Sequence, residues 1–322
     1  MSKKISLSYH EKNGQIFRLA RSNAIYLFLL LFFVAACFAS PHFRSVSNIT
    51  TLLSQSSIIG ILAIGQTIVL ITGGFDLSHG SFLALVSVLI AIVIPTSIFG
   101  AFLAAMVSLL VLGFVNGFFV NKGISPFIVT LGMQGIARTL ALWLANSKSI
   151  SFKADISVFA YGSLFGIPYC VIIWVILMAV FAFILNKTVP GRHIYAIGGN
   201  SESARLSGVN VEAVRYFAYC ISAFCSFAAG VIYVSKLGVG MPDKAVGYEM
   251  DSIACAIIGG TSLFGGVGKL SGTLAGVLIY GIITNIQNLM GVSAYWQDVI
   301  KGLIILVAVY FNLVSNRRQR GA

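Results

Sequence analysis

The stretch LITGGFDLSHGS, residues 70–81, contains an acid and an imidazole whose types and spacing could do chemistry. Asp76 precedes His79 by three residues, and residues 45–75 before them include no Asp, Glu, Lys or Arg. An acid within an apolar membrane segment costs about 2.5–3.5 kcal/mol on insertion scales, so Asp76 requires a partner. The sequence offers three: backbone N–H groups at a helix start, His79, or a cation elsewhere in the chain.

Two interpretations of this segment are open. Paired glycines, Gly73 and Gly74, loosen or end a helix, and a broken helix at membrane depth is tolerated only inside protein or beside water. If the acid is structural, Asp76 or Ser78 caps the next helix. If the break lines a pathway, the acid contacts cargo or governs opening. We expect His79, at the end of the break, to face cargo or water.

Further polar residues lie within apolar segments. Such residues usually face the bundle interior or a watery path, although an uncharged group can instead bond a neighbouring helix. Many of them are amides, which suit a hydroxyl-rich cargo. The candidates for a pathway or gate are Gly73, Gly74, Asp76, His79, Asn116, Gln134, Asn285 and Asn288.

The stretch GGNSESARLSGVN carries the signature of a short helix, with Asn200 or Ser201 as N-cap and Gly208 as the stop. Small residues alternate there with larger ones. Such a helix either fits a groove of another protein or lies on the membrane as an ordinary amphipathic helix. The candidate contact residues are Asn200, Ser203, Ala204, Arg205, Ser207 and Gly208.

Enzyme motifs are not found. GGVGKLSG approaches a phosphate loop but has Leu263 and Leu270 where glycine and Ser or Thr are needed. H-E-x-x-H, G-x-S-x-G and EF-hand strings are absent. We expect no catalytic residue, no metal site and no cofactor in this chain. The five cysteines form no C-x-x-C pair, and we interpret them as small buried hydrophobes.

The composition predicts which secondary-structure elements position these residues. The 322-residue chain is 58% hydrophobic and 9% charged, with a mean hydropathy of +0.94, whereas soluble domains carry about 25% charged residues. A membrane helix needs roughly 20 apolar residues, so we predict an all-α, polytopic membrane protein with a break near 72–80. The ten predicted spans are 24–40, 50–71, 80–95, 98–120, 125–145, 168–186, 214–235, 250–267, 270–290 and 295–314.

The cations predict the orientation. With the N-terminus inside, the inside segments hold 14 of the 21 Lys and Arg residues and the outside segments hold five, as the positive-inside rule requires. This distribution, rather than nucleic-acid binding, explains the net charge of +12. We expect a cytoplasmic segment 1–23, a membrane domain 24–314 with a cytoplasmic loop 186–215, and a cytoplasmic tail 315–322.

Two outside loops are long enough to bear function. Residues 146–167 and 236–249 carry mixed charges, which suit salt-sensitive docking of a partner. These charges include Lys148, Lys153, Asp155, Lys244 and Glu249. A weak echo between GGFDLSHG (73–80) and GGTSLFGG (259–266) raises the hypothesis of an internal repeat.

Four segments carry a resemblance to a known family. They are GQTIVLITGGFDLSHGS (65–81), GRHIYAIGGNSESARLSGVNV (191–211), IIGGTSLFGGVGKLSGTLAGVLI (257–279) and NLMGVSAYWQDVIKGLIILVAV (288–309). In order and spacing they resemble the permease subunits of bacterial ribose-type sugar ABC importers. That family includes permeases for ribose, xylose, arabinose, galactose, other polyols and the autoinducer-2 signal. The family often has Val or a small apolar residue where this chain has His79.

The resemblance implies partners. Two permease subunits, identical or different, form the pore in the inner membrane lipid, a cytoplasmic ATPase binds ATP and Mg²⁺, and a periplasmic binding protein delivers the sugar. It also implies that the segment around Asn200–Gly208 docks on the ATPase. We therefore expect a permease for a monosaccharide or small polyol. The alternative is a secondary transporter or facilitator without an ATPase, which the shortage of membrane carboxylates disfavours.

Overall fold

The computed structural model describes residues 24–320, with the side chains of the last helix described to Tyr310 and at Asn312. The fold is helical, as predicted. Its helices are Ala24–Ala39, η1 (Pro41–Arg44), α2 (Val46–Ile71), α3 (His79–Val93), α4 (Ile98–Asn121), α5 (Pro126–Leu144), α6 (Val158–Tyr161), α7 (Tyr169–Lys187), α8 (Val189–Gly199), α9 (Ser201–Leu206), α10 (Val211–Leu237), α11 (Tyr248–Ile258), α12 (Leu270–Leu289) and α13 (Ala294–Arg320). Two antiparallel pairs of two-residue strands complete it: β1 (Ile150–Ser151) with β4 (Val239–Gly240), and β2 (Ser163–Leu164) with β3 (Ile167–Pro168).

Six helices of the described chain are long and apolar enough to cross a membrane, namely α2, α4, α5, α7, α10 and α12. The chain is therefore a multi-pass membrane protein. The helix Ala24–Ala39 and α3 are apolar but shorter. Because a spanning helix needs roughly 20 residues, the predicted count of ten membrane-spanning helices is not confirmed.

The predicted span 250–267 is wrong in extent, because α11 ends at Ile258. Gly259 follows as its C-cap, and Gly260 has a φ of +87°, a left-handed conformation that a side chain disfavours. The chain then runs without helix until Leu270. The end of the chain also differs from prediction, since α13 continues to Arg320 and so includes most of the predicted tail. The predicted segment 1–23 lies outside the described residues.

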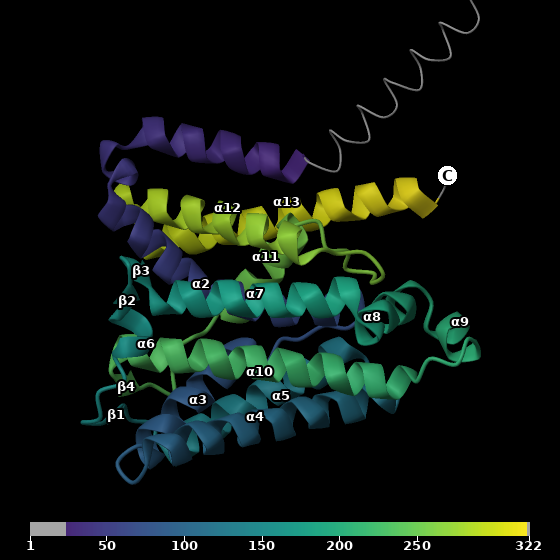
Figure 1. Ribbon diagram of the computed structural model, residues 1–322, viewed down its shortest axis with the longest axis horizontal. Helices are drawn as coiled ribbons and strands as arrows, with labels where there is room; N and C mark the ends of the chain where they lie inside the picture. The colour runs from purple at the N-terminus through teal and green to yellow at the C-terminus, as the bar shows by residue number, and fades with distance from the viewer. Residues whose placement is uncertain (1–23, 321–322) are drawn as a thin grey trace, which may run out of the picture.

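The helices run side by side, and the connecting elements gather at two ends of the bundle (Figure 1). The small helix α9, the start of Ala24–Ala39 and the far end of α13 lie at one end. The four short strands and α6 lie at the other. The first end is the one predicted to be cytoplasmic, and we call it the inner end; the opposite one is the outer end.

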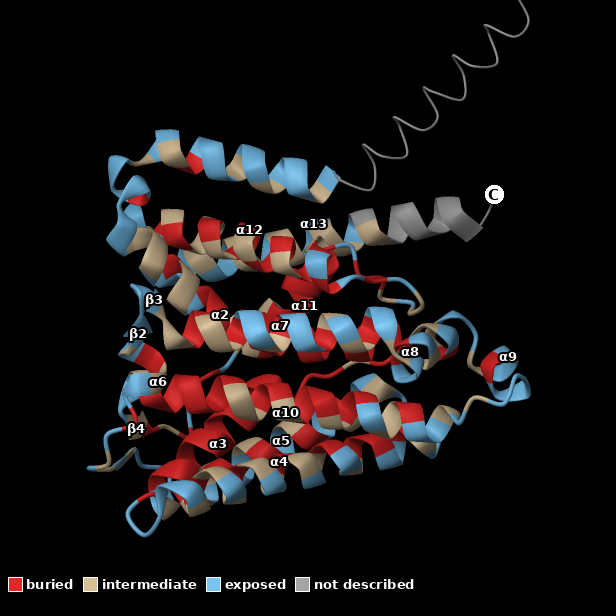
Figure 2. Cartoon of the chain, viewed as in Figure 1, coloured by how far each residue is buried: buried red, intermediate tan, exposed pale blue. Residues whose placement is uncertain are grey.

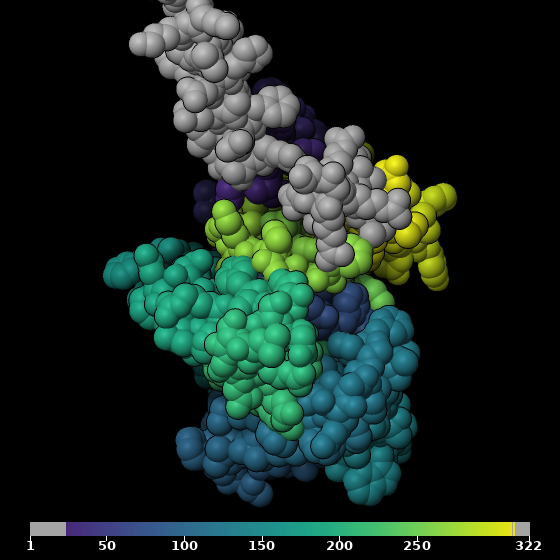
Figure 3. Space-filling model, turned by 90° about the vertical axis from the view of Figure 1, so that its right-hand side faces the viewer, coloured from purple at the N-terminus to yellow at the C-terminus, as the bar shows by residue number. Residues whose placement is uncertain are grey.

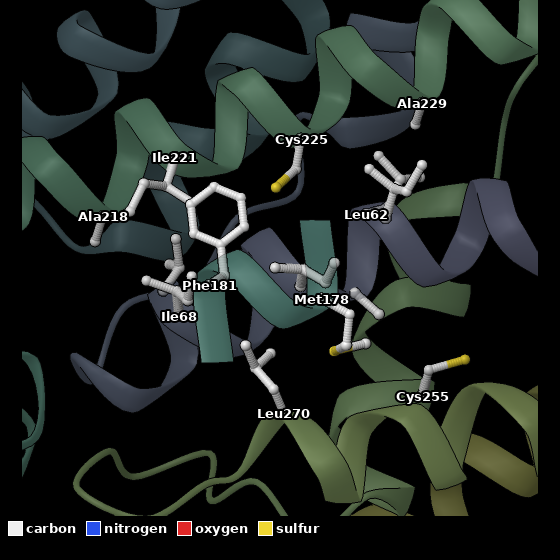
Figure 4. Packing of buried hydrophobic residues seen from close by; sticks show 14 of the residues in the cluster. Leu62, Ile68, Met178, Phe181, Ala218, Ile221, Cys225, Ala229, Cys255 and Leu270 are labelled. Atoms are coloured by element: carbon white, nitrogen blue, oxygen red, sulfur yellow. The ribbon is translucent and has the colours of Figure 1, made fainter. Parts of the chain in front are cut away.

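The centre of the bundle is α2, which packs against α7, α10, α11 and α12. A helix that is apolar on all sides belongs in a core, and α2 and α10 are mostly buried. Figure 2 shows that α4, by contrast, has a largely exposed outer side. Figure 4 shows how the core closes: Phe181 of α7 and Cys225 of α10 lie close to Leu62 and Ile68 of α2. Cys170, Cys225 and Cys255 are fully buried, as predicted for small hydrophobes, whereas Cys37 and Cys220 are only half-buried.

Two glycine-rich breaks meet beside α8. The Gly266 N–H donates to the Ile71 carbonyl at 2.9 Å, which joins the segment after α11 to the end of α2. A Cβ on Gly198 of α8 would lie 1.7 Å from that same carbonyl oxygen. Only glycine permits such a close backbone approach. The two segments that resemble each other in sequence therefore touch, and their origin as a repeat remains a hypothesis.

Candidate functional site

The break between α2 and α3 comprises residues 72–78. Gly73 has a φ of +78°, and Gly74 packs so closely that a Cβ would lie 2.9 Å from the Tyr219 hydroxyl oxygen. Both glycines line a cavity of about 250 Å³ together with Arg215 and the turn after α4. The glycines thus border open space near the inner end, whereas the two ionisable residues that follow them do not line this cavity.

Asp76 is buried, and hydrogen-bond donors surround it. Its Oδ1 accepts from the Ser78 backbone N–H at 2.9 Å and from Ser78 Oγ at 2.5 Å. Its Oδ2 accepts from Ser222 Oγ of α10 at 2.6 Å. The acid therefore forms an Asx turn into α3 and anchors the break to α10. The N-cap position itself belongs to Ser78, whose side chain makes no capping bond.

His79 is fully buried, so within this chain it does not face water as we expected. Its Nε2 lies 2.8 Å from Ser222 Oγ and its Nδ1 lies 3.1 Å from Ser252 Oγ of α11. The nearest Asp76 oxygen is 3.8 Å from Nε2. The imidazole therefore joins α3 to α10 and α11. The expectation failed because Ser222 and Ser252 come from helices far along the chain.

Glu249 extends this buried cluster. It was expected as an exposed charge in an outer loop, but only 4% of the residue is exposed. Its Oε1 accepts from Gln134 Nε2 of α5 at 3.1 Å and from the Gly247 N–H at 3.2 Å, and its Oε2 has no hydrogen-bond partner among the described residues. The expected docking role of Glu249 is therefore wrong, because the start of α11 packs inside the bundle.

The other predicted pathway residues are not brought together. Asn116 is buried in α4, and its amide has no hydrogen-bond partner within residues 24–320. Asn285 forms two reciprocal hydrogen bonds with Asn48 of α2, at 2.9 and 3.0 Å. Asn288 is exposed and accepts from Gln297 at 3.0 Å. Of the predicted set, only the break residues and Gln134 belong to one neighbourhood.

The predicted coupling segment forms α8 and α9. Asn200 is the N-cap of α9, with its Oδ1 accepting from the Ser203 N–H at 2.9 Å, and Gly208 has a φ of +85° just after the helix. Arg205 is exposed and pairs with Glu202 at 2.9 Å, whereas Ala204 is buried. Figure 3 looks at the inner end, where the teal-to-green surface of this region faces the viewer.

The outer loops retain exposed charges. Lys244 pairs with Asp243 at 3.6 Å, with both side chains more than half exposed. Asp155 accepts from the Ser157 N–H at 2.9 Å, and the hydrogen bonds from Ser157 lower the pKa of this carboxyl. These residues, unlike Glu249, are accessible to a partner at the outer end.

A larger cavity, of about 690 Å³, opens between α2, α10, α11, α12 and α13 near the outer end. We call it the outer cavity. Polar and charged groups line it: Gln55, Lys236, Asp251, Thr284, Asp298, Lys301 and the hydroxyl-bearing Tyr233, Tyr248 and Tyr280. Sequence reasoning missed Asp251, although an acid within a predicted span was itself a signal.

Comparisons with known proteins match most of the chain to permease components of transport systems. A family model described as "Branched-chain amino acid transport system / permease component" matches residues 48–309. The "Ribose import permease protein RbsC" of Haemophilus influenzae is 38% identical over 92% of this chain and 94% of its own length. RbsC of Bacillus subtilis is 39% identical over 88% of this chain and 89% of its own. The "L-arabinose transport system permease protein AraH" of Escherichia coli is 36% identical over 91% of this chain and 90% of its own. No solved structure matches the chain significantly.

Proposed function

We propose a transport function from one premise: the chain belongs to the family of permease components whose model matches residues 48–309. In this proposal it is the membrane subunit of an ABC importer in the bacterial cytoplasmic membrane and forms the path of a monosaccharide. One observation carries the proposal: relatives named for sugar import or sugar transport are similar over nearly the whole chain. The family description names amino acids, but those relatives favour a sugar.

The relatives do not single out one sugar as the cargo. Relatives named for ribose, L-arabinose and D-allose are 38%, 36% and 38% identical to this chain. These values are too close to separate pentoses from a hexose. A neutral monosaccharide is therefore the proposed cargo.

The proposed assembly has three kinds of part. Two permease subunits flank the pathway, a cytoplasmic ATPase binds α9 at the inner end, and a binding protein delivers sugar to the outer loops. Within each subunit, ten segments enter the bilayer, with α3 and α11 reaching only part of the way from opposite ends. The exposed position of α9 and its Arg205 supports the ATPase contact.

Uptake of radiolabelled D-ribose, L-arabinose and D-allose by cells that express the importer tests the proposal. We expect uptake of at least one sugar, lost on deletion of the ATPase gene. Uptake that persists without the ATPase would indicate a facilitator or secondary transporter. Uptake of leucine but of none of the sugars would overturn the sugar assignment.

A further inference from the structure

We propose that the outer cavity is a binding subsite for an uncharged monosaccharide, with Asp251 as its principal hydroxyl-binding group and Tyr280 as the residue that positions it. This inference rests on the proposed function and deepens it. The cavity has about 690 Å³, which is within the range of small-molecule sites, roughly 300–1,000 Å³. A monosaccharide and several waters fit in this space.

Charged side chains converge on this cavity from three helices. Lys236 lies in the last turn of α10, Asp251 lies in the first turn of α11, and Asp298 and Lys301 lie near the start of α13. Charged residues within membrane helices face the bundle interior or water, because lipid exposure is costly. These charges favour a hydrated cavity over one filled by lipid chains.

The signs of these charges select the ligand. Two cations and two acids line the cavity, and Lys301 already pairs with Asp298 at 3.2 Å. The site has no excess of positive charge for a phosphate or a sugar acid. An uncharged polyol, which donates to carboxylates and accepts from an ammonium group, matches this balance.

A hydrogen bond positions the Asp251 carboxylate to accept from sugar hydroxyls. The Tyr280 hydroxyl of α12 donates to Asp251 Oδ1, which fixes the carboxylate at the cavity wall. Hydrogen bonds to a charged acceptor are about twice as strong as those between neutral groups. The half-buried Lys236 ammonium has no ion-pair partner among the described residues and can donate to a ring or hydroxyl oxygen.

Two aromatic rings join aliphatic side chains such as Ile58 and Met250 in the apolar part of the site. Tyr233 and Tyr248 pack edge to face, with ring centroids 5.8 Å apart, and both line the cavity. A tyrosine offers an apolar face and a polar tip. Sugars carry C–H groups and hydroxyls side by side, so this mixture of surfaces suits them better than an amino acid side chain of purely aliphatic character.

The test compares variants of the assembled importer in membranes. Asp251→Asn removes the charged acceptor and Tyr280→Phe removes the hydroxyl that holds it. We expect Asp251→Asn to lower the uptake rate of the transported sugar about tenfold, in keeping with the usual strength of charged hydrogen bonds. We expect Tyr280→Phe to lower the uptake rate less strongly. Tyr26→Phe is the matched control, because the Tyr26 hydroxyl bonds Ser271 and lies outside this cavity; we expect its uptake to stay within about twofold of wild type.

A second readout reports occupancy directly. In a Thr284→Cys variant, the new thiol lines the cavity, and its labelling by an impermeant methanethiosulfonate is quantified by mass spectrometry of its peptide. We expect excess sugar to slow labelling, D-ribose 5-phosphate not to slow it, and Asp251→Asn to abolish the protection.

The outcomes separate the two proposals. A wild-type importer that takes up none of the three sugars refutes the proposed function. A wild-type importer that transports sugar, with Asp251→Asn and Tyr280→Phe equally active or with Thr284→Cys unprotected, refutes only the subsite. Protection by ribose 5-phosphate refutes the uncharged ligand. If the Asp251→Asn protein fails to accumulate in the membrane, the uptake rate of Tyr280→Phe and the protection of Thr284→Cys by sugar test the subsite instead.

Discussion

Three hydrogen bonds converge on the Asp76 carboxylate, and each comes from a serine. Because Ser78 belongs to the break and Ser222 to α10, the acid both shapes the turn into α3 and ties it to the bundle core. This geometry explains how a buried carboxylate is tolerated at such depth: donors from serine satisfy both of its oxygens, and His79 Nε2 lies 3.8 Å from Oδ2.

The first prediction concerns this residue. Asp76→Asn keeps an acceptor for the Ser78 N–H, and its amide can donate to Ser222 Oγ, so we expect a small loss of stability. Asp76→Leu leaves buried donors unpaired, each costing about 1–3 kcal/mol, so its free energy of unfolding falls by roughly 2 kcal/mol or more. Thermal denaturation of the solubilised protein measures both variants. Normal stability of Asp76→Asn with no uptake would instead assign Asp76 to the pathway.

At the scale of elements, the meeting of the two breaks with α8 links the membrane core to the coupling segment. Gly198 contacts the end of α2 through its backbone, while the next residue, Gly199, has open space around its Cβ position. This adjacent pair lets packing be separated from helix propensity, because both glycines belong to α8.

The second prediction uses that pair. Gly198→Ala forces α8 away from the Ile71 carbonyl, and overpacking of this kind costs typically 1–3 kcal/mol. Gly199→Ala should leave stability unchanged within about 0.5 kcal/mol. Melting temperatures of the two solubilised variants give the comparison. Equal melting temperatures would mean that the contact between α8 and the break is absent.

The third prediction concerns α9. Its exposed Arg205–Glu202 pair contributes little to folding, about 0–1 kcal/mol at most. Arg205→Glu should therefore insert normally but repel or misplace the partner ATPase, so that sugar uptake falls more than tenfold while ATP hydrolysis continues. Sugar uptake is measured in intact cells and ATP hydrolysis in inverted vesicles, with Lys153→Glu at the outer end as a charge-matched control for hydrolysis. Unchanged coupling in Arg205→Glu would remove α9 from the interface.

At the scale of the whole molecule, the two ends of the bundle differ in their elements and charges. The inner end carries α8 and α9, and the outer end carries the strand pairs and the exposed Lys244–Asp243 pair. Between them, α4 and α5 present many exposed apolar side chains, among them Phe114 and Leu131. Such surfaces suit lipid or a second subunit.

The fourth prediction tests this sidedness. A cysteine in place of Ser203 in α9 should react with an impermeant thiol reagent only in inverted vesicles. A cysteine in place of Lys244 should react only in cells whose outer membrane has been permeabilised and whose cytoplasmic membrane is intact. Labelling is compared with the parent chain, whose native cysteines are buried or half-buried. Reaction of the Ser203 cysteine from outside would invert the topology.

Local features followed from the sequence alone. Composition identified a helical membrane protein, and the Asn200 cap and the Gly208 stop formed where they were expected, because capping depends on residues only three or so apart. The break at Gly73 and Gly74 was likewise readable, since glycine permits its backbone conformation.

Only the tertiary structure decided what those local features face. Ser222 reaches Asp76 from 146 residues away and Ser252 reaches His79 from 173 residues away, so burial of the imidazole is invisible to any sequence window. The same holds for Glu249, which packs inside, and for Asp251, whose partner Tyr280 lies on the next helix. Spacing along the chain sets turns and caps, whereas the packing of distant helices determines which polar groups meet and whether a cavity forms between them.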